Sequence, residues 1–122
     1  MITVLPVKEE AKLKALFEKA AQPMAVYSGA VEAVDTATDE VLGFCLFDID
    51  DKITIGAIEP QGDDAMLADG LLRSALHVGV TRGIGQAFYN QFAPVELLKQ
   101  LGFIADETER ALKIEKLTAC GC

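Results

Sequence analysis

The segment VLGFCLFDIDDKITIGAIEP, residues 41–60, contains the clearest structural signal in the sequence. Two apolar stretches, 41–49 and 53–58, flank the polar triplet 50–52, a pattern typical of a β-hairpin. The first stretch is apolar at both sets of alternating positions, which indicates a strand covered on both faces. One face is predicted to carry Val41, Cys45, Phe47 and Ile49, and the other Leu42, Phe44 and Leu46. Gly56 in the second stretch predicts a bulge or a close backbone approach.

The hairpin leads into IEPQGDDAMLADGLL, residues 58–72, where a strand ends at a proline and a helix begins a few residues later. The helical spacing predicts a long helix over 64–82, ended by Gly83. Its exposed side is expected to carry Asp69 and Arg73, an i,i+4 pair, together with His77. Its buried stripe is predicted to consist of Leu67, Ala68, Leu71, Leu72, Ala75 and Gly79.

Shorter elements are predicted on both sides of this centre. Before it, the pattern predicts a strand at 2–7, an amphipathic helix at 9–21, a strand at 24–35 and a polar turn at 36–40. After it, the pattern predicts a strand at 84–90, a short helix at 94–101 and a last strand at 110–117. This order indicates a single α/β domain over 1–117, followed by a flexible cysteine-containing tail at 118–122.

Composition narrows the classes of partner. The chain has 122 residues, is 51% hydrophobic and carries a formal net charge of −8, which argues against nucleic acid and anionic membranes. The acidic balance is compatible with a cationic substrate such as an amine. No apolar run reaches the roughly 18 residues that cross a bilayer, and residues 1–14 lack a signal-peptide pattern, so we expect a cytoplasmic protein. Three cysteines, an odd number, without a secretion signal argue against a disulfide framework.

Three segments, in this order, resemble the GNAT superfamily of N-acetyltransferases. Residues 41–60 are similar to the family's central hairpin, which ends in Val/Ile-x-Pro before the cofactor loop. LLRSALHVGVTRGIGQAFYN, residues 71–90, resembles the helix under that loop and the next strand, and ELLKQLGF, residues 96–103, resembles the late helix with its Leu-Gly-Phe ending. The resemblance covers about 40–104; the N-terminal third matches only in element order. It implies a mixed, mostly antiparallel central sheet, flanked by helices and splayed near Gly56, and transfer of an acetyl group from acetyl-CoA to a small-molecule or peptide amine.

The resemblance also locates the pyrophosphate loop, and the sequence departs from the family there. The family typically has Arg-Gly-x-Gly-x-Gly; the matching positions here are Asp63, Asp64, Ala65, Met66, Leu67 and Ala68. Two interpretations stand. A carboxylate could cap the helix amides itself, stabilising the helix by about 1 kcal/mol and repelling a second anion. Alternatively, Gln61, Gly62 and the amides after Asp64 could be rearranged around the pyrophosphate of a bound cofactor.

Candidate catalytic groups follow from the same resemblance. In the family, a backbone N–H of the strand before the loop polarises the thioester carbonyl, which implies the amides of Ala57 and Ile58. Glu59 is the nearest carboxylate for a general base, with Asp48 as second choice; a solvated charge is the alternative for either. The family's usual acid is a tyrosine on the late helix, where Leu98 stands here. Tyr89 and Asn90 could reach the cleft and partly substitute, or Tyr89 could be packed with its hydroxyl at the rim.

The acceptor side and the tail leave further alternatives open. The family usually has a second helix before the central strands, whereas Pro23 leads almost directly into a strand, so the acceptor side would be open or completed by a second copy in a homodimer. No metal site is expected, because Cys120 and Cys122 would need two tails to supply four ligands. The sequence therefore supports two main hypotheses: an acyl-CoA-dependent N-acetyltransferase of unknown amine, or a degenerate GNAT-fold protein that acts as a binding or interaction module. A thiol or metal protein that uses Cys120 and Cys122 is kept as a minor third hypothesis.

Overall fold

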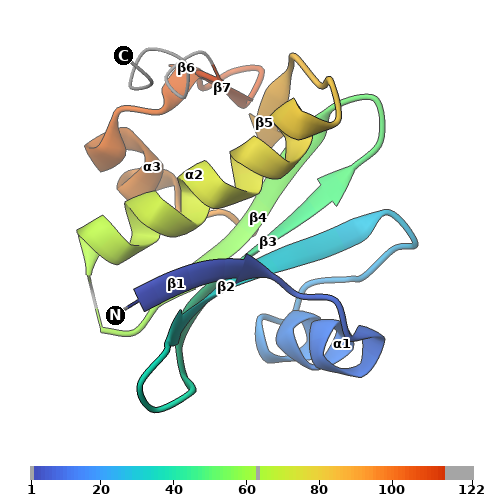
Figure 1. The fold of residues 1–122 in the computed structure, drawn as a ribbon. Coiled ribbons are helices and arrows are strands. Elements are labelled where there is room, and N and C mark those ends of the chain that lie inside the picture. The colour runs from blue at the N-terminus through green and yellow to red at the C-terminus, as the bar shows by residue number, and fades with distance from the viewer. Residues whose placement is uncertain (1, 63, 115–122) are drawn as a thin grey trace.

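The computed structural model describes residues 2–62 and 64–114, and it has one mixed sheet with helices on both sides (Figure 1). The sheet order is β1-β2-β3-β4-β5-β7-β6. The elements, in chain order, are β1 (Ile2–Pro6), α1 (Glu10–Lys19), β2 (Ser28–Asp35), β3 (Glu40–Ile49), β4 (Ile53–Pro60), α2 (Ala65–Thr81), β5 (Ala87–Tyr89), α3 (Val95–Leu101), β6 (Ile104–Asp106) and β7 (Ala111–Leu112).

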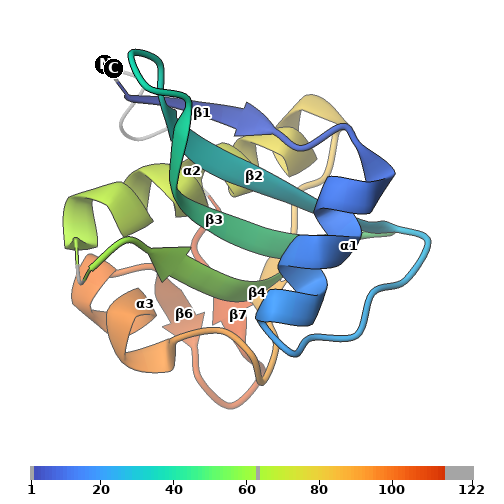
Figure 2. The same ribbon diagram turned by 90° about the horizontal axis from the view of Figure 1, so that it is seen from below.

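Helices cover both faces of β3, as its doubly apolar sequence predicted (Figure 2). On one face Phe44 and Leu46 pack with Phe17 of α1. On the other, Cys45 and Phe47 join the larger core that contains the buried side of α2. The prediction for Leu42 was wrong: it packs against the α2-side core, because the β2–β3 register skips it between the pairs Ala33–Gly43 and Val34–Val41. An extra residue in a strand reverses the alternation of faces beyond it.

The sheet splays beside Gly56, as predicted. β4 pairs with β5 in parallel, the one parallel pair among the described strands, and the register covers only Ile53–Ile55. The amide of Asn90 then donates to the carbonyl of Ile55 at 2.9 Å, and the two strands part. β4 continues to Pro60 without β5 beside it. The predicted bulge is also confirmed, because Gly56 and Ala57 together face Leu46 of β3.

Some predicted strand limits were wrong. β2 begins at Ser28 because residues 25–28 form a turn, in which the Ser28 hydroxyl accepts the amide of Ala25 at 2.8 Å. β5 is three residues long, and 104–106 forms an unpredicted strand, β6. Within the described residues the predicted last strand is formed by Ala111–Leu112, and its predicted end at 115–117 lies outside them. The predicted tail at 118–122 lies outside the described residues. In the described part of the chain, no helix is long and apolar enough to cross a membrane.

Candidate functional site

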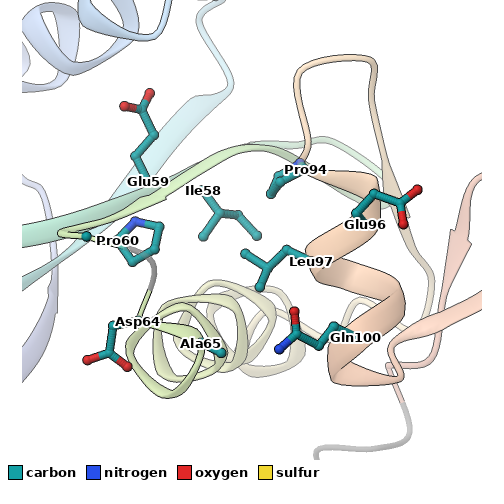
Figure 3. Close-up of a pocket in the computed structure, with 10 residues that line it drawn as sticks. Ile58, Glu59, Pro60, Asp64, Ala65, Pro94, Glu96, Leu97 and Gln100 are labelled. Carbon is teal, nitrogen blue, oxygen red and sulfur yellow. The ribbon is translucent and has the colours of Figure 1, made fainter.

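A cavity of about 560 Å³ lies where β4 continues past the end of its pairing with β5, between β4, the start of α2 and α3. Its inner surface is mainly apolar: the side chains of Ile58 and Leu97 point toward one another across it, with Pro60 and Ala65 beside them (Figure 3). The lining residues are Ile58, Glu59, Pro60, Gly62, Asp64, Ala65, Pro94, Glu96, Leu97 and Gln100. We call this cavity the cleft.

The bulge decides which backbone amide of β4 faces the cleft. The amide of Gln61 donates to the carbonyl of Leu42 on β3 at 2.6 Å. Hydrogen-bonded and non-hydrogen-bonded pairs alternate along an antiparallel ladder, so the pair Cys45–Ile58, three positions further along, is non-hydrogen-bonded. The N–H and C=O of Ile58 therefore point away from β3, to the side that β5 has left. Without the extra residue in β4, Ile58 would hydrogen-bond to β3.

The second predicted amide is engaged elsewhere. The N–H of Ala57 donates to Oε1 of Gln22 at 3.0 Å, a contact 35 residues apart in sequence and buried. Gln22 follows α1 and is only 5% exposed. Its side chain lies against Gly56, where an added Cβ would collide with the carboxamide. Sequence reasoning missed Gln22; the prediction of a close approach at Gly56 was its single local signal. Of the two amides, that of Ile58 is directed to the cleft.

The start of α2 is capped by its own carboxylate. Oδ1 of Asp64 accepts the amides of Met66 at 3.0 Å and Leu67 at 3.1 Å. The self-capped interpretation is thus confirmed for Asp64, while Asp63 lies outside the described residues. Met66 is 87% exposed, and Ala68 is buried in the core. These N-terminal amides of α2 are therefore already satisfied, so an anion would have to displace Asp64 to reach them.

The turn before α2 contains the other predicted loop residues. Gly62 has φ +65, a conformation that favours glycine, and it lines the cleft. Gln61 is exposed, and its amide is the one bonded to Leu42. Ala65 lines the cleft at the first turn of α2, and Leu67 is partly buried against the core.

In the described part of the chain, the charged residues that line the cleft are acidic. Among its described lining residues, Glu59, Asp64 and Glu96 are charged, and none is a lysine or arginine. Lys99 of α3 lies 3.9 Å from Glu96 but is bonded to Glu107 at 2.6 Å, and the Glu107 contact is the main cause that raises the pKa of Lys99. A diphosphate about 6 Å from the carboxylate of Asp64 or Glu96 would be repelled by roughly 0.7 kcal/mol per pair of unit charges in water. The cleft thus suits an uncharged acyl or pantetheine-like chain. Its acidic rim, which we define as Glu59, Asp64 and Glu96, does not suit a diphosphate.

The predicted catalytic side chains lie in different places. Glu59 is exposed and points to the opposite side of β4 from Ile58 and Leu97 (Figure 3). That side is the α1 face, because Glu59 lies opposite Phe44 of β3, and the side chain of Phe44 packs with α1. Tyr89 is 5% exposed, belongs to the α2-side core and is not among the described residues of the cleft. Glu59 therefore borders the cleft with its carboxylate on the α1 side of β4, and Tyr89 is not brought to the cleft.

Other candidate residues have structural roles in the described part of the chain. Asn90 stabilises the turn after β5: its Oδ1 accepts the amide of Phe92 at 2.9 Å and its carbonyl accepts that of Ala93 at 3.1 Å. Asp48 accepts a hydrogen bond from the Ser28 hydroxyl at 2.5 Å. His77 is exposed on α2, as predicted. No cluster of three or more potential metal ligands occurs within 2–62 and 64–114, and Cys120 and Cys122 lie beyond this range.

Comparisons with known proteins agree on the architecture. No family model matches the sequence, and no curated protein matches it. Among solved structures, an acetyltransferase from Trypanosoma brucei gives a TM-score of 0.63 at 14% identity, over 88% of this chain and 95% of that chain. An IAA acetyltransferase from Bacillus cereus gives 0.63 at 15% identity, over 83% and 75%. A ribosomal-protein-alanine N-acetyltransferase from Brucella melitensis gives 0.58 at 16% identity, over 87% and 92%.

These similarities define the class of fold. The chain is an α/β protein whose mostly antiparallel sheet opens beside a single described parallel pair. Its fold is that of the GNAT superfamily, and its structural neighbours are acetyltransferases.

Proposed function

We propose that the protein is an N-acyltransferase that moves an acyl group, acetyl in the first instance, from a thioester to an amine. The observation that supports this most directly is the direction of the Ile58 amide, which points into an apolar cleft at the splay of β4 and β5. Acetyl-CoA is the donor that the fold implies. Its thioester end matches the apolar lining, whereas its diphosphate would meet the acidic rim.

For this reaction the protein has to position the two substrates, stabilise the oxyanion and accept a proton from the amine. The amine nitrogen attacks the thioester carbonyl, the C–N bond forms, and the C–S bond breaks with the thiolate leaving. The Ile58 N–H would stabilise the oxyanion, and removal of one such donor typically costs about 2.7–4 kcal/mol. Glu59 would accept one proton of the ammonium form on the α1 face, which frees the nitrogen lone pair for attack, and the second N–H proton would pass to water as the C–S bond breaks. The thiolate would take its proton from water, since Tyr89 is not among the described residues lining the cleft.

The acceptor is expected to be a cation before it reacts. Glu59 is exposed on the α1 face, and the chain has a net charge of −8, so a protonated amine would be attracted rather than repelled. A small-molecule amine and a peptide amine both fit this description. In the described N-terminal part, α1 is the one helix before β2, which leaves the face beside Glu59 accessible.

The acidic charge at the cleft also favours a second candidate function, ligand binding without acyl transfer. Asp64 already satisfies two α2 amides, and the cleft's described charges are carboxylates. Both features suit a GNAT-fold protein that binds a neutral or cationic ligand in the cleft without transferring an acyl group.

A donor comparison distinguishes the two functions. The melting temperature and thiol release are followed with acetyl-CoA and with S-acetylpantetheine, which has the thioester arm but no phosphates. A ligand at about 100 times its Kd stabilises the fold by about 2.7 kcal/mol. Acyl transfer predicts amine-dependent thiol release with at least one donor. If millimolar donor causes no melting shift and no thiol release, the second function is supported.

The amide itself is tested by substitution. Ile58→Pro removes the N–H, and the strand pairing permits it because this amide does not bond to β3. Ile58→Ala is the matched control, which loses a similar amount of buried side chain but keeps the N–H. We expect the proline variant to be at least about 100-fold slower than the alanine variant. Equal rates would exclude the amide as the oxyanion donor.

A further inference from the structure

The turn that follows α1 places the side chain of Gln22 against β4. The helix ends with two reverse hydrogen bonds, from the amide of Ala21 to the carbonyl of Glu18 at 3.1 Å and from the amide of Gln22 to that of Phe17 at 3.0 Å. These two bonds form a Schellman motif, in which the residue that follows the helix has a positive φ and is usually glycine. Here it is Ala21, with φ 55. The backbone accepts a disfavoured conformation, and the conformation carries Gln22 onto β4.

Gln22 completes the bulge of β4. Its Oε1 accepts the Ala57 amide at 3.0 Å in a buried position, where an unpaired N–H would be costly. Gly56 supplies the room, since a Cβ there would collide with the carboxamide. If the acceptor were lost, the Ala57 amide would have no partner in a buried position, and the peptide groups of the bulge would rotate to relieve it. The Ile58 amide would then no longer be held in the direction of the cleft, while the side chains of β4 stay on their faces.

We propose that Gln22 is a positioning residue for acyl transfer: by holding the Ala57 amide it keeps the bulge in place, and the bulge directs the Ile58 amide to the thioester oxygen. This inference rests on the proposed function. Gln22 acts through the backbone and does not touch the reacting atoms. Its loss should therefore lower kcat, because the oxyanion is stabilised less, while KM changes little because the apolar lining of the cleft is unchanged.

Three variants and a control test the inference. Gln22→Met keeps the length of the side chain but has no strong acceptor. Gln22→Glu keeps an acceptor oxygen at the same reach. Gly56→Ala retains Gln22 but displaces its carboxamide. Gln91→Met, the same substitution at an exposed glutamine, is the control. Circular dichroism and melting establish that each variant is folded.

Kinetics with S-acetylpantetheine or acetyl-CoA supply the first measurement. We expect Gln22→Met and Gly56→Ala to lower kcat by about 10- to 100-fold, with KM within about twofold of wild type. Gln22→Glu should recover most of the loss, and Gln91→Met should behave like wild type. A Gln22→Met variant with unchanged kcat would overturn the inference. So would loss of activity that appears entirely in KM.

Amide hydrogen exchange supplies a measurement that does not depend on turnover. In folded wild-type protein, the Ala57 amide should be protected, and Gln22→Met should move the resonances of Ala57 and Ile58 more than those of β2. Unmoved resonances would refute the positioning role. If wild-type protein turns over neither donor, both the proposed function and the role of Gln22 in catalysis are refuted. The exchange data would then show only whether Gln22 holds the Ala57 amide in its observed direction.

Discussion

Leu98 occupies the position where the resembling enzymes commonly have a tyrosine, and its side chain is fully buried. Its neighbour Leu97 lines the cleft instead. Successive helical residues point in directions about 100° apart, so both side chains cannot face the same space. The orientation of α3 thus makes position 98 part of the core, and a tyrosine there would not reach a thiolate in the cleft.

The first prediction uses this difference. Leu98→Tyr adds volume to a packed core and should lower the free energy of unfolding by about 1–3 kcal/mol, with no gain in acyl-transfer rate. Leu97→Tyr, directed to the cleft, should change stability by much less. Urea unfolding measures both variants. A Leu98→Tyr variant as stable as wild type would indicate that α3 is rotated from the orientation described.

Cys45 gives a second prediction at this scale. It has 0% exposure, and burial raises the pKa of its thiol, so the reactive thiolate is strongly disfavoured in the folded protein. Iodoacetamide at pH 8 should leave Cys45 unmodified in native protein and modify it in denaturant. Peptide mapping by mass spectrometry reads the site directly. Modification in native protein at the rate of a free thiol would contradict this burial.

At the scale of elements, the N-terminus of α2 supports a third prediction. Asp64→Ala removes the acceptor of the Met66 and Leu67 amides and should cost about 1 kcal/mol. This corresponds to a fall of roughly 3–6 °C in the melting temperature. Asp64→Asn keeps a capping oxygen without the charge and should melt within about 2 °C of wild type. Equal losses in both variants would mean that charge, rather than the hydrogen bonds, stabilises this end of α2.

The same pair of variants separates capping from repulsion in donor binding. If the Asp64 charge obstructs the diphosphate, Asp64→Asn should bind acetyl-CoA more tightly than wild type, with no change for S-acetylpantetheine. Calorimetric titration measures both donors. Unchanged affinity for acetyl-CoA would remove the charge of Asp64 as the obstacle.

The elements also show what the sequence could and could not reveal. The hairpin at 41–60 and the bulge were predictable because alternation and a strand glycine are local signals. β6 was not, because a strand of three residues exists only through its pairing with β7. β7 lies within the predicted last strand, but its two-residue length depends on its pairing with β5 and β6. Within the site, the Asp64 cap was local and predictable. Gln22 was not, since its partner Ala57 lies 35 residues away and the contact depends on the whole α1 face.

For the molecule as a whole, charge is the feature that connects sequence to function. The net charge is −8, and the described charged residues of the cleft repeat that sign. A donor with phosphates and a protonated amine therefore meet opposite electrostatic forces on the same protein. Because both forces act largely through solvent, salt should screen both, with the Debye length falling from about 30 Å at 0.01 M to about 10 Å at 0.1 M.

The fourth prediction is that salt changes the affinities for the two substrates in opposite directions. Between about 0.01 M and 0.1 M KCl, acetyl-CoA should bind more tightly, by roughly threefold, because screening removes about 0.6 kcal/mol of repulsion. The KM of a cationic amine should rise over the same range. S-acetylpantetheine, which has no phosphates, is the control and should change by less than about 1.5-fold. Weaker acetyl-CoA binding at higher salt would require a cationic contact to its phosphates, and would show that the acidic rim does not govern donor binding.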